Sequence, residues 1–167
     1  MAEKIWIPKS KYDLMKLINA DISLSCIDTS LITDMSRIFE LDDRDDFSGI
    51  EKWNVSNVTD MSYMFYNASS FNININSWDT SSVTNMSGMF SEAESFNQPL
   101  GKWNVANVEN MSFIFYAAVS FNQNLDSWNI REKVINHSIF EATQLEANQT
   151  LPKWFQKFLA KEAQKES

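Results

Sequence analysis

The chain has 167 residues and a formal net charge of −8, and this acidity argues against the phosphate backbone of a nucleic acid as its partner. Gly and Pro occur only three times each and 44% of the residues are apolar, which excludes a linker-rich chain and allows one domain with a core. One cysteine excludes an internal disulfide framework. No apolar run reaches the length of a signal peptide or a membrane span, so we expect a cytoplasmic protein without a transmembrane segment.

A single domain is expected over residues 1–167, and its first 23 residues are expected to form an N-terminal cap. Residues 9–20 carry apolar side chains at helical spacing: Tyr12, Leu14, Met15, Leu17 and Ile18. They predict an amphipathic helix that covers one exposed end of the core.

Residues 24–154 contain about five copies of one repeat. Its tryptophans lie 25 residues apart at Trp53, Trp78, Trp103 and Trp128, and Trp154 follows after a step of 26. A fixed period in this range predicts a stack of one supersecondary unit. After the first three tryptophans, Val, Met, Met or Ile, Phe, Ala and Phe recur at spacings of three and four, behind Asp, Asn, Ser or Thr. Such spacings with such N-cap residues predict a short helix in each repeat.

The segment around each tryptophan has a different pattern. Leu100, Trp103 and Val105 show an apolar-x-x-apolar-x-apolar spacing, which is typical of the strand in a leucine-rich repeat. The sequence therefore predicts an α/β repeat, a single short leucine-rich-repeat-like solenoid. It should have parallel short strands on one face, short helices on the other, and helical N- and C-terminal caps. We expect the tryptophan rings of successive coils to stack inside it.

An asparagine follows the last phenylalanine of each repeat, at Asn72, Asn97 and Asn122. Turns leave backbone N–H and C=O groups without local partners, and amide side chains can satisfy them from one coil to the next. We expect these asparagines to form a structural ladder. Beyond the last coil, residues 152–167 are expected to form the C-terminal cap helix, and four of its side chains should be buried: Trp154, Phe155, Phe158 and Leu159.

The repeat resembles that of a known family. The run Trp-Asn/Asp-Val/Thr-Ser-x-Val-Thr-Asp/Asn-Met-Ser-x-Met-Phe-x-x-Ala-x-x-Phe-Asn is similar to the 25- to 26-residue repeat of the BspA-like leucine-rich-repeat surface proteins of bacteria. This resemblance covers about residues 24–154. It implies a leucine-rich-repeat-like fold and a role in binding, often of host or neighbouring-cell surfaces. It also implies a surface or secreted location if the chain is a trimmed piece.

The inventory for chemistry is small. His137 is the one histidine and Cys26 the one cysteine, so the usual metal-ligand sets cannot be assembled. The acidic run 42–46 lacks the spacing of an EF-hand and is expected to be a solvated loop, although the sequence leaves cation binding there open. No nucleophile elbow or phosphate loop occurs. We therefore expect no enzymatic activity, no catalytic or metal-ligating residues and no cofactor.

Residues that flank each tryptophan should point away from the core, along the concave side of the predicted sheet. They form a polar surface with spaced lysines on an otherwise acidic protein. The candidate binding residues are Lys52, Asn54, Ser77, Asp79, Lys102, Asn104, Ser127 and Asn129. They predict a non-enzymatic protein–protein interaction module of the BspA-like type that binds a protein partner of unknown identity.

Two other binding functions stay open. A cytoplasmic immunity- or inhibitor-type protein would use the acidic outer surface to neutralise a basic toxin or nucleic-acid enzyme. A glycan-binding module would use the asparagine-rich face together with exposed aromatic residues such as Tyr66 and Tyr116. Neither alternative needs a nucleic-acid or membrane partner.

Overall fold

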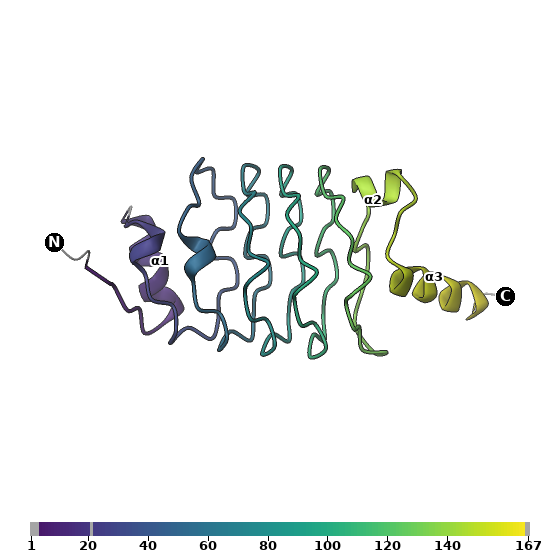
Figure 1. Ribbon diagram of the computed structural model, residues 1–167, viewed down its shortest axis with the longest axis horizontal. Helices are drawn as coiled ribbons and strands as arrows, with labels where there is room; N and C mark the ends of the chain where they lie inside the picture. Colours follow the sequence, from purple (N-terminus) through teal and green to yellow (C-terminus); the bar gives the residue numbers. More distant parts are fainter. Residues whose placement is uncertain (1–3, 21, 166–167) are drawn as a thin grey trace.

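The computed structural model describes residues 4–20 and 22–165 and shows a stack of similar coils, with the two chain ends at opposite ends of the stack (Figure 1). Residues 1–3 and 21 of the predicted N-terminal cap, and 166–167 of the predicted C-terminal cap, lie outside these ranges. The helical elements are α1 (Lys11–Asn19), the 3-10 turns η1 (Leu24–Cys26) and η2 (Ile50–Lys52), α2 (Gln144–Ala147) and α3 (Lys153–Lys165). None of these helices is long and apolar enough to cross a bilayer.

The predicted α/β leucine-rich-repeat-like solenoid with parallel strands is wrong. Over the residues that the structure describes, β structure is limited to isolated parallel bridges. One bridge joins Trp6 to Ile27, and a single column of bridges joins successive coils at Asp34, Asp60, Asn85, Asn110 and Ile135. In residues 22–143, the coils have neither a sheet nor the expected row of short helices (Figure 1).

Each predicted repeat helix is instead a series of turns, in residues 35–41, 61–67, 86–92, 111–117 and 136–142, which we call the turn halves. In the second of them, alternate backbone N–H groups donate to the next coil at 2.8–2.9 Å; they belong to Met61, Tyr63, Phe65 and Asn67. Tyr63 and Asn67 have left-handed φ angles of 54° and 52°. A helix requires every N–H to bond four residues back, so these inter-coil bonds replace it. Turns bury the same apolar spacing that a helix would.

The predicted strand segments also turn too sharply to form strands. They occupy residues 50–58, 75–83, 100–108 and 125–134, which we call the tryptophan halves. In each of them the tryptophan N–H donates to the carbonyl three residues earlier; for Trp103 this acceptor is Leu100, at 3.1 Å. A second turn follows when Val108 donates to Val105 at 3.1 Å. Two turns within nine residues leave no extended run for a strand ladder.

Phenylalanines, rather than tryptophans, form the continuous ring column of the core. Successive coils stack the rings of Phe39, Phe65, Phe90, Phe115 and Phe140 with centroids 5.6–5.8 Å apart. A second column contains Phe71, Phe96 and Phe121, at 5.6 and 5.8 Å. The expected stack of tryptophan rings is present for Trp128 and Trp154, at 6.3 Å. Trp53, Trp78 and Trp103 pack beside the phenylalanine column, as Trp103 does 6.0 Å from Phe90.

Each repeat tryptophan joins its coil to the preceding one through the indole N–H. Trp103 Nε1 donates to the Ile75 carbonyl at 3.0 Å, and equivalent bonds of 2.8–3.2 Å are made by Trp53, Trp78, Trp128 and Trp154. The first four tryptophans are buried, at 3–4% exposure. Burial thus satisfies both the apolar ring and its one polar group.

The predicted asparagine ladder is present after the last phenylalanine of the repeats. Asn72 Oδ1 accepts from the Asn97 N–H at 3.0 Å, and Asn97 Oδ1 accepts from the Asn122 N–H at 2.9 Å. Gln123 Nε2 also donates to Asn97 Oδ1, at 2.8 Å. These side chains therefore bond the coils of Asn97 and Asn122 to the coils before them.

Helices lie at both ends of the stack. In α1, which Ser10 caps by accepting from the Asp13 N–H, Leu14 and Ile18 are buried, whereas Tyr12 is exposed. At the other end, Phe155 of α3 contacts the ring of Phe140 with a centroid distance of 5.0 Å. Trp154 and Phe158 also pack on the core, whereas Leu159 is exposed.

Candidate functional site

The eight predicted binding residues lie on the tryptophan halves, one on each side of a buried tryptophan, and all of them are exposed. We call this set the polar strip; it comprises Lys52, Asn54, Ser77, Asp79, Lys102, Asn104, Ser127 and Asn129. The alternation of exposed and buried positions is therefore the one expected for a strand, although the backbone turns. Because the described residues form isolated bridges and no sheet, the strip does not lie on a concave sheet face.

Three Asx residues of the polar strip are held by the backbone beside them. The side-chain oxygens of Asn54, Asp79 and Asn104 each accept the N–H two residues on, at 3.1 Å. This is an Asx turn, which orients both the side chain and the following turn. The hydroxyl and N–H of Ser81 donate to Asp79 and lower the pKa of its carboxyl below the ordinary 3.8. Asp79 thus stays ionised at neutral pH.

Lys102 and Ser127 of the strip are bonded to the preceding coil. The Lys102 N–H donates to Asn76 Oδ1 at 2.9 Å, and Ser127 Oγ donates to the Gly101 carbonyl at 2.9 Å. Within the described residues, the ammonium groups of Lys52 and Lys102 form no ion pair. The strip therefore presents two unpaired cations on a backbone of fixed register.

Residues beyond both ends of the polar strip are partly buried. Cys26 is half-buried in η1, and its carbonyl accepts from the Trp6 N–H at 2.8 Å. Phe155, which was expected to be buried in the C-terminal cap helix, packs in α3 against Phe140. The strip thus ends where the terminal helices begin.

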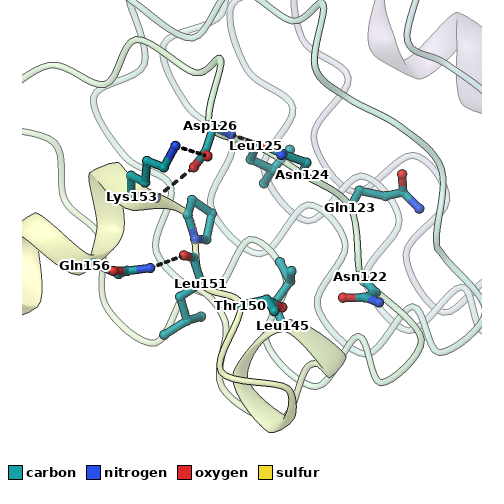
Figure 2. A pocket seen from close by; sticks show the side chains of 11 residues that line it. Asn122, Gln123, Asn124, Leu125, Asp126, Leu145, Thr150, Leu151, Lys153 and Gln156 are labelled. Atoms are coloured by element: carbon teal, nitrogen blue, oxygen red, sulfur yellow. Dashed lines mark hydrogen bonds and ion pairs between the residues drawn. The ribbon is translucent and has the colours of Figure 1, made fainter.

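A hollow of about 300 Å³ lies where the C-terminal segment joins the stack, and Figure 2 shows its lining side chains. Its most polar groups bond to one another: Lys153 N–H donates to Asp126 Oδ1 at 2.8 Å, and Lys153 Nζ lies 3.4 Å from Asp126 Oδ2. Gln156 Nε2 donates to the Leu151 carbonyl at 2.6 Å. Because these polar groups bond to one another at the junction between the C-terminal segment and the stack, we interpret the hollow as structural.

A second surface, which the sequence analysis missed, follows the turn halves. One position recurs two residues after the first residue of each turn half; we call these positions the turn row, and they are Arg37, Tyr63, Gly88, Phe113 and Ser138. Gly88 is buried beneath the Tyr63 ring, and the other four are exposed or partly exposed. All five have left-handed φ angles between 46° and 61°. The sequence carries a signal for this row in the variable x of Met-Ser-x-Met-Phe, because a variable position in a fixed repeat indicates a surface position.

Aromatic pairs lie along this row. Tyr63 packs edge-on against Tyr66 with centroids 5.9 Å apart, and Phe113 packs likewise against Tyr116 at 6.0 Å. Tyr66 and Tyr116, singled out as exposed aromatics, are thus half-buried members of these pairs. Tyr66 Oη donates to Glu92 Oε1 at 3.1 Å, and this bond to a carboxylate raises the pKa of Tyr66.

The residues that the sequence analysis considered for chemistry have separate structural roles. His137 is exposed, and its backbone carbonyl accepts from the Phe113 N–H. In the acidic loop, Arg44 Nε donates to Asp42 Oδ1 at 2.8 Å, and its guanidinium lies 5.1 Å from the Phe39 centroid. Across residues 4–20 and 22–165, no three His, Cys, Asp or Glu side chains converge to hold a metal ion.

Comparison with known proteins gives one result. Residues 33–154 match a family model with the description "Mycoplasma protein of unknown function, DUF285". The match covers the coils from the first turn half to Trp154. No curated protein and no solved structure matches the chain. The family description contains nothing about BspA-like repeats, so that resemblance stays a prediction.

Proposed function

Because the chain belongs to the DUF285 family of Mycoplasma proteins of unknown function, we propose its role from its surface: it is a non-enzymatic module that binds a protein partner on the polar strip. The observation that carries this proposal is the pair of unpaired lysines, Lys52 and Lys102, on a chain of net charge −8. A cationic pair on an acidic protein is a local reversal of charge. Such reversals orient a partner and select for complementary charge.

The rigidity of the strip supports the same function. Its backbone is fixed by the Asx turns and by inter-coil bonds such as that of Lys102 N–H to Asn76 Oδ1. A surface that is already ordered loses little conformational entropy on association. The amide and hydroxyl groups of Asn104 and Ser77 add hydrogen-bonding capacity between the lysines. The partner surface that fits is polar and carries carboxylates spaced to meet both ammonium groups.

A charge-reversal experiment tests the proposal. The full chain, bearing an affinity tag, is used to capture and identify a partner, and binding of that purified partner is then titrated. The double variant Lys52→Glu with Lys102→Glu is expected to bind about tenfold more weakly, a loss of about 1.4 kcal/mol, because two attractive charge pairs become repulsive.

The matched control reverses two exposed lysines outside the strip, Lys9→Glu with Lys133→Glu, and so makes the same change in net charge. It is expected to leave the dissociation constant within about twofold. Equal losses in the two double variants would show that net charge, and not the strip, controls binding. Unchanged binding in both would remove the strip from the interaction.

A further inference from the structure

Another hollow, of about 310 Å³, lies between α3 and the last tryptophan half, at the end of the polar strip. Apolar side chains from both elements line it together with an amide and two ammonium groups. These lining residues include Asn129, Ile130, Trp154, Lys157, Phe158 and Lys161. The hollow therefore joins an apolar surface to hydrogen-bonding and cationic groups.

The hollow lies where α3 takes the place of a further coil. The side chain two residues after the tryptophan is 0–1% exposed in three coils, at Val55, Thr80 and Val105. The equivalent residue of the last coil, Ile130, is half-buried. Trp154 still stacks on Trp128 as the tryptophan of a further coil would, with centroids 6.3 Å apart. The chain then continues as a helix, which leaves Ile130 partly uncovered.

One face of α3 forms the other side of the hollow. Trp154, Lys157, Phe158 and Lys161 are spaced by three, one and three residues, so they lie on the same face of the helix. The rings of Trp154 and Phe158 pack edge-on, with centroids 6.4 Å apart. α3 contains four lysines and one glutamate, on a chain of net charge −8. The hollow is thus bordered by a basic helix.

The polar groups of the hollow are available to a ligand. Within the described residues, the Lys157 ammonium forms no ion pair, and Lys161 Nζ lies 3.4 Å from Glu132 Oε1 with both side chains exposed. Exposed pairs of this kind are weak and exchange their partners readily. Asn129 also lacks the Asx turn that the other three Asx residues of the polar strip make. Its amide can therefore donate to another molecule.

We propose that this hollow binds an aliphatic side chain of the protein partner that is flanked by carboxylates. The aliphatic group would pack on Ile130, Trp154 and Phe158, while a neighbouring carboxylate accepts from Lys157 and from the Asn129 amide. The inference rests on the proposed function, because Asn129 belongs to the polar strip. Protein interfaces usually combine an apolar centre with a polar rim. The strip provides only polar groups, and the hollow adds the apolar anchor.

The test uses the full chain and a defined probe, the capped tripeptide acetyl-Asp-Leu-Asp-amide, titrated by NMR. The expected response is a shift of the Asn129 side-chain amide and of the Trp154 ring resonances. The peptide with glycine in place of leucine should bind about tenfold more weakly, because it lacks the apolar side chain. The peptide with both aspartates replaced by asparagine should bind about threefold more weakly, because it lacks the charges. Equal binding by either control peptide, or no shift from the leucine peptide, would overturn the assignment.

Variants test the two sides of the hollow. Ile130→Thr reduces the apolar surface and suits the fold, since Thr80 holds the same position two coils earlier; it should weaken binding of the leucine peptide about threefold. Lys157→Glu should weaken it by a similar factor. The matched control Lys9→Glu makes the same change in net charge on an exposed lysine near the other end of the stack, and should stay within about twofold. Equal losses in Lys157→Glu and Lys9→Glu would contradict a local role of Lys157.

Titration of the captured partner separates this inference from the proposed function. If the Lys52→Glu, Lys102→Glu double variant loses affinity for the partner and Ile130→Thr does not, the polar strip stands and the hollow is removed from the interface. If the leucine peptide binds at the hollow and the double variant keeps full affinity for the partner, the hollow stands and the strip is removed.

Discussion

The two halves of each coil are bonded to their neighbours by different parts of the chain. In the turn halves, backbone N–H groups such as those of Phe90 and Glu92 donate directly to the next coil, both at 2.8 Å. In the tryptophan halves, the inter-coil bonds come largely from side chains, among them the indole of Trp103 and the hydroxyl of Thr80. Residue identity should therefore matter more for stability in the tryptophan half. The turn half can vary its exposed side chains without losing these backbone bonds.

The largest expected effect concerns Trp103. Trp103→Phe removes part of the buried ring and leaves the Ile75 carbonyl without its donor, so we expect a loss of about 2–3 kcal/mol in the free energy of unfolding. Phe90→Leu, in the turn half, removes ring contacts but no hydrogen bond and should cost about 1–1.5 kcal/mol. Urea denaturation followed by circular dichroism measures both. A larger loss for Phe90→Leu would reverse the ranking of the two halves.

A smaller effect separates two exposed asparagines. Asn104→Ala removes the acceptor of the Ala106 N–H and should cost about 1 kcal/mol. Asn67→Ala keeps the bond that matters, because the backbone N–H of residue 67 still donates to the Ser91 carbonyl. Alanine is already found in that backbone conformation at Ala117, with a φ of 54°. The loss at Asn67 should therefore stay near 0.5 kcal/mol, about the limit for surface changes. Similar losses at both sites would mean that the side-chain bonds of the tryptophan half add little.

The sequence predicted the period of the stack, the burial of the tryptophans and the asparagine ladder, because each depends on a position fixed in every repeat. It predicted the terminal helices α1 and α3 but not the secondary structure of the repeats. The spacing of Met61, Met64 and Phe65 suits one face of a helix, but it suits a stacked series of turns equally well. Only the choice of hydrogen-bond partner separates the two, and that partner, such as the Ser87 carbonyl for Tyr63, lies in the next coil.

The same reason explains why the exposure of the polar strip was predicted and the aromatic pairs of the turn row were not. The exposure of Lys52 and Asn54 followed from their position beside Trp53, which holds for a strand and for these turns alike. The aromatic pairs could not be predicted, because a helical Tyr63 and a turn Tyr63 point in different directions. Left-handed φ angles at non-glycine residues have no firm sequence signal, and here the chain adopts them where the inter-coil bonds compensate their cost.

The smallest effect tests the side-chain bonds of the tryptophan half by pH. Because Ser81 donates to the Asp79 carboxylate, the folded-state pKa lies below 3.8, the ordinary value that the unfolded chain should have. The ionised carboxylate thus stabilises the fold above pH 3.8, and this contribution is lost as the pH falls through the lowered folded value. Asp79→Asn keeps an acceptor for the Ser81 N–H and cannot titrate, so its unfolding free energy should fall less than that of the native chain below about pH 4. Parallel pH profiles for the two proteins would show that the Asx turn at Asp79 does not depend on charge.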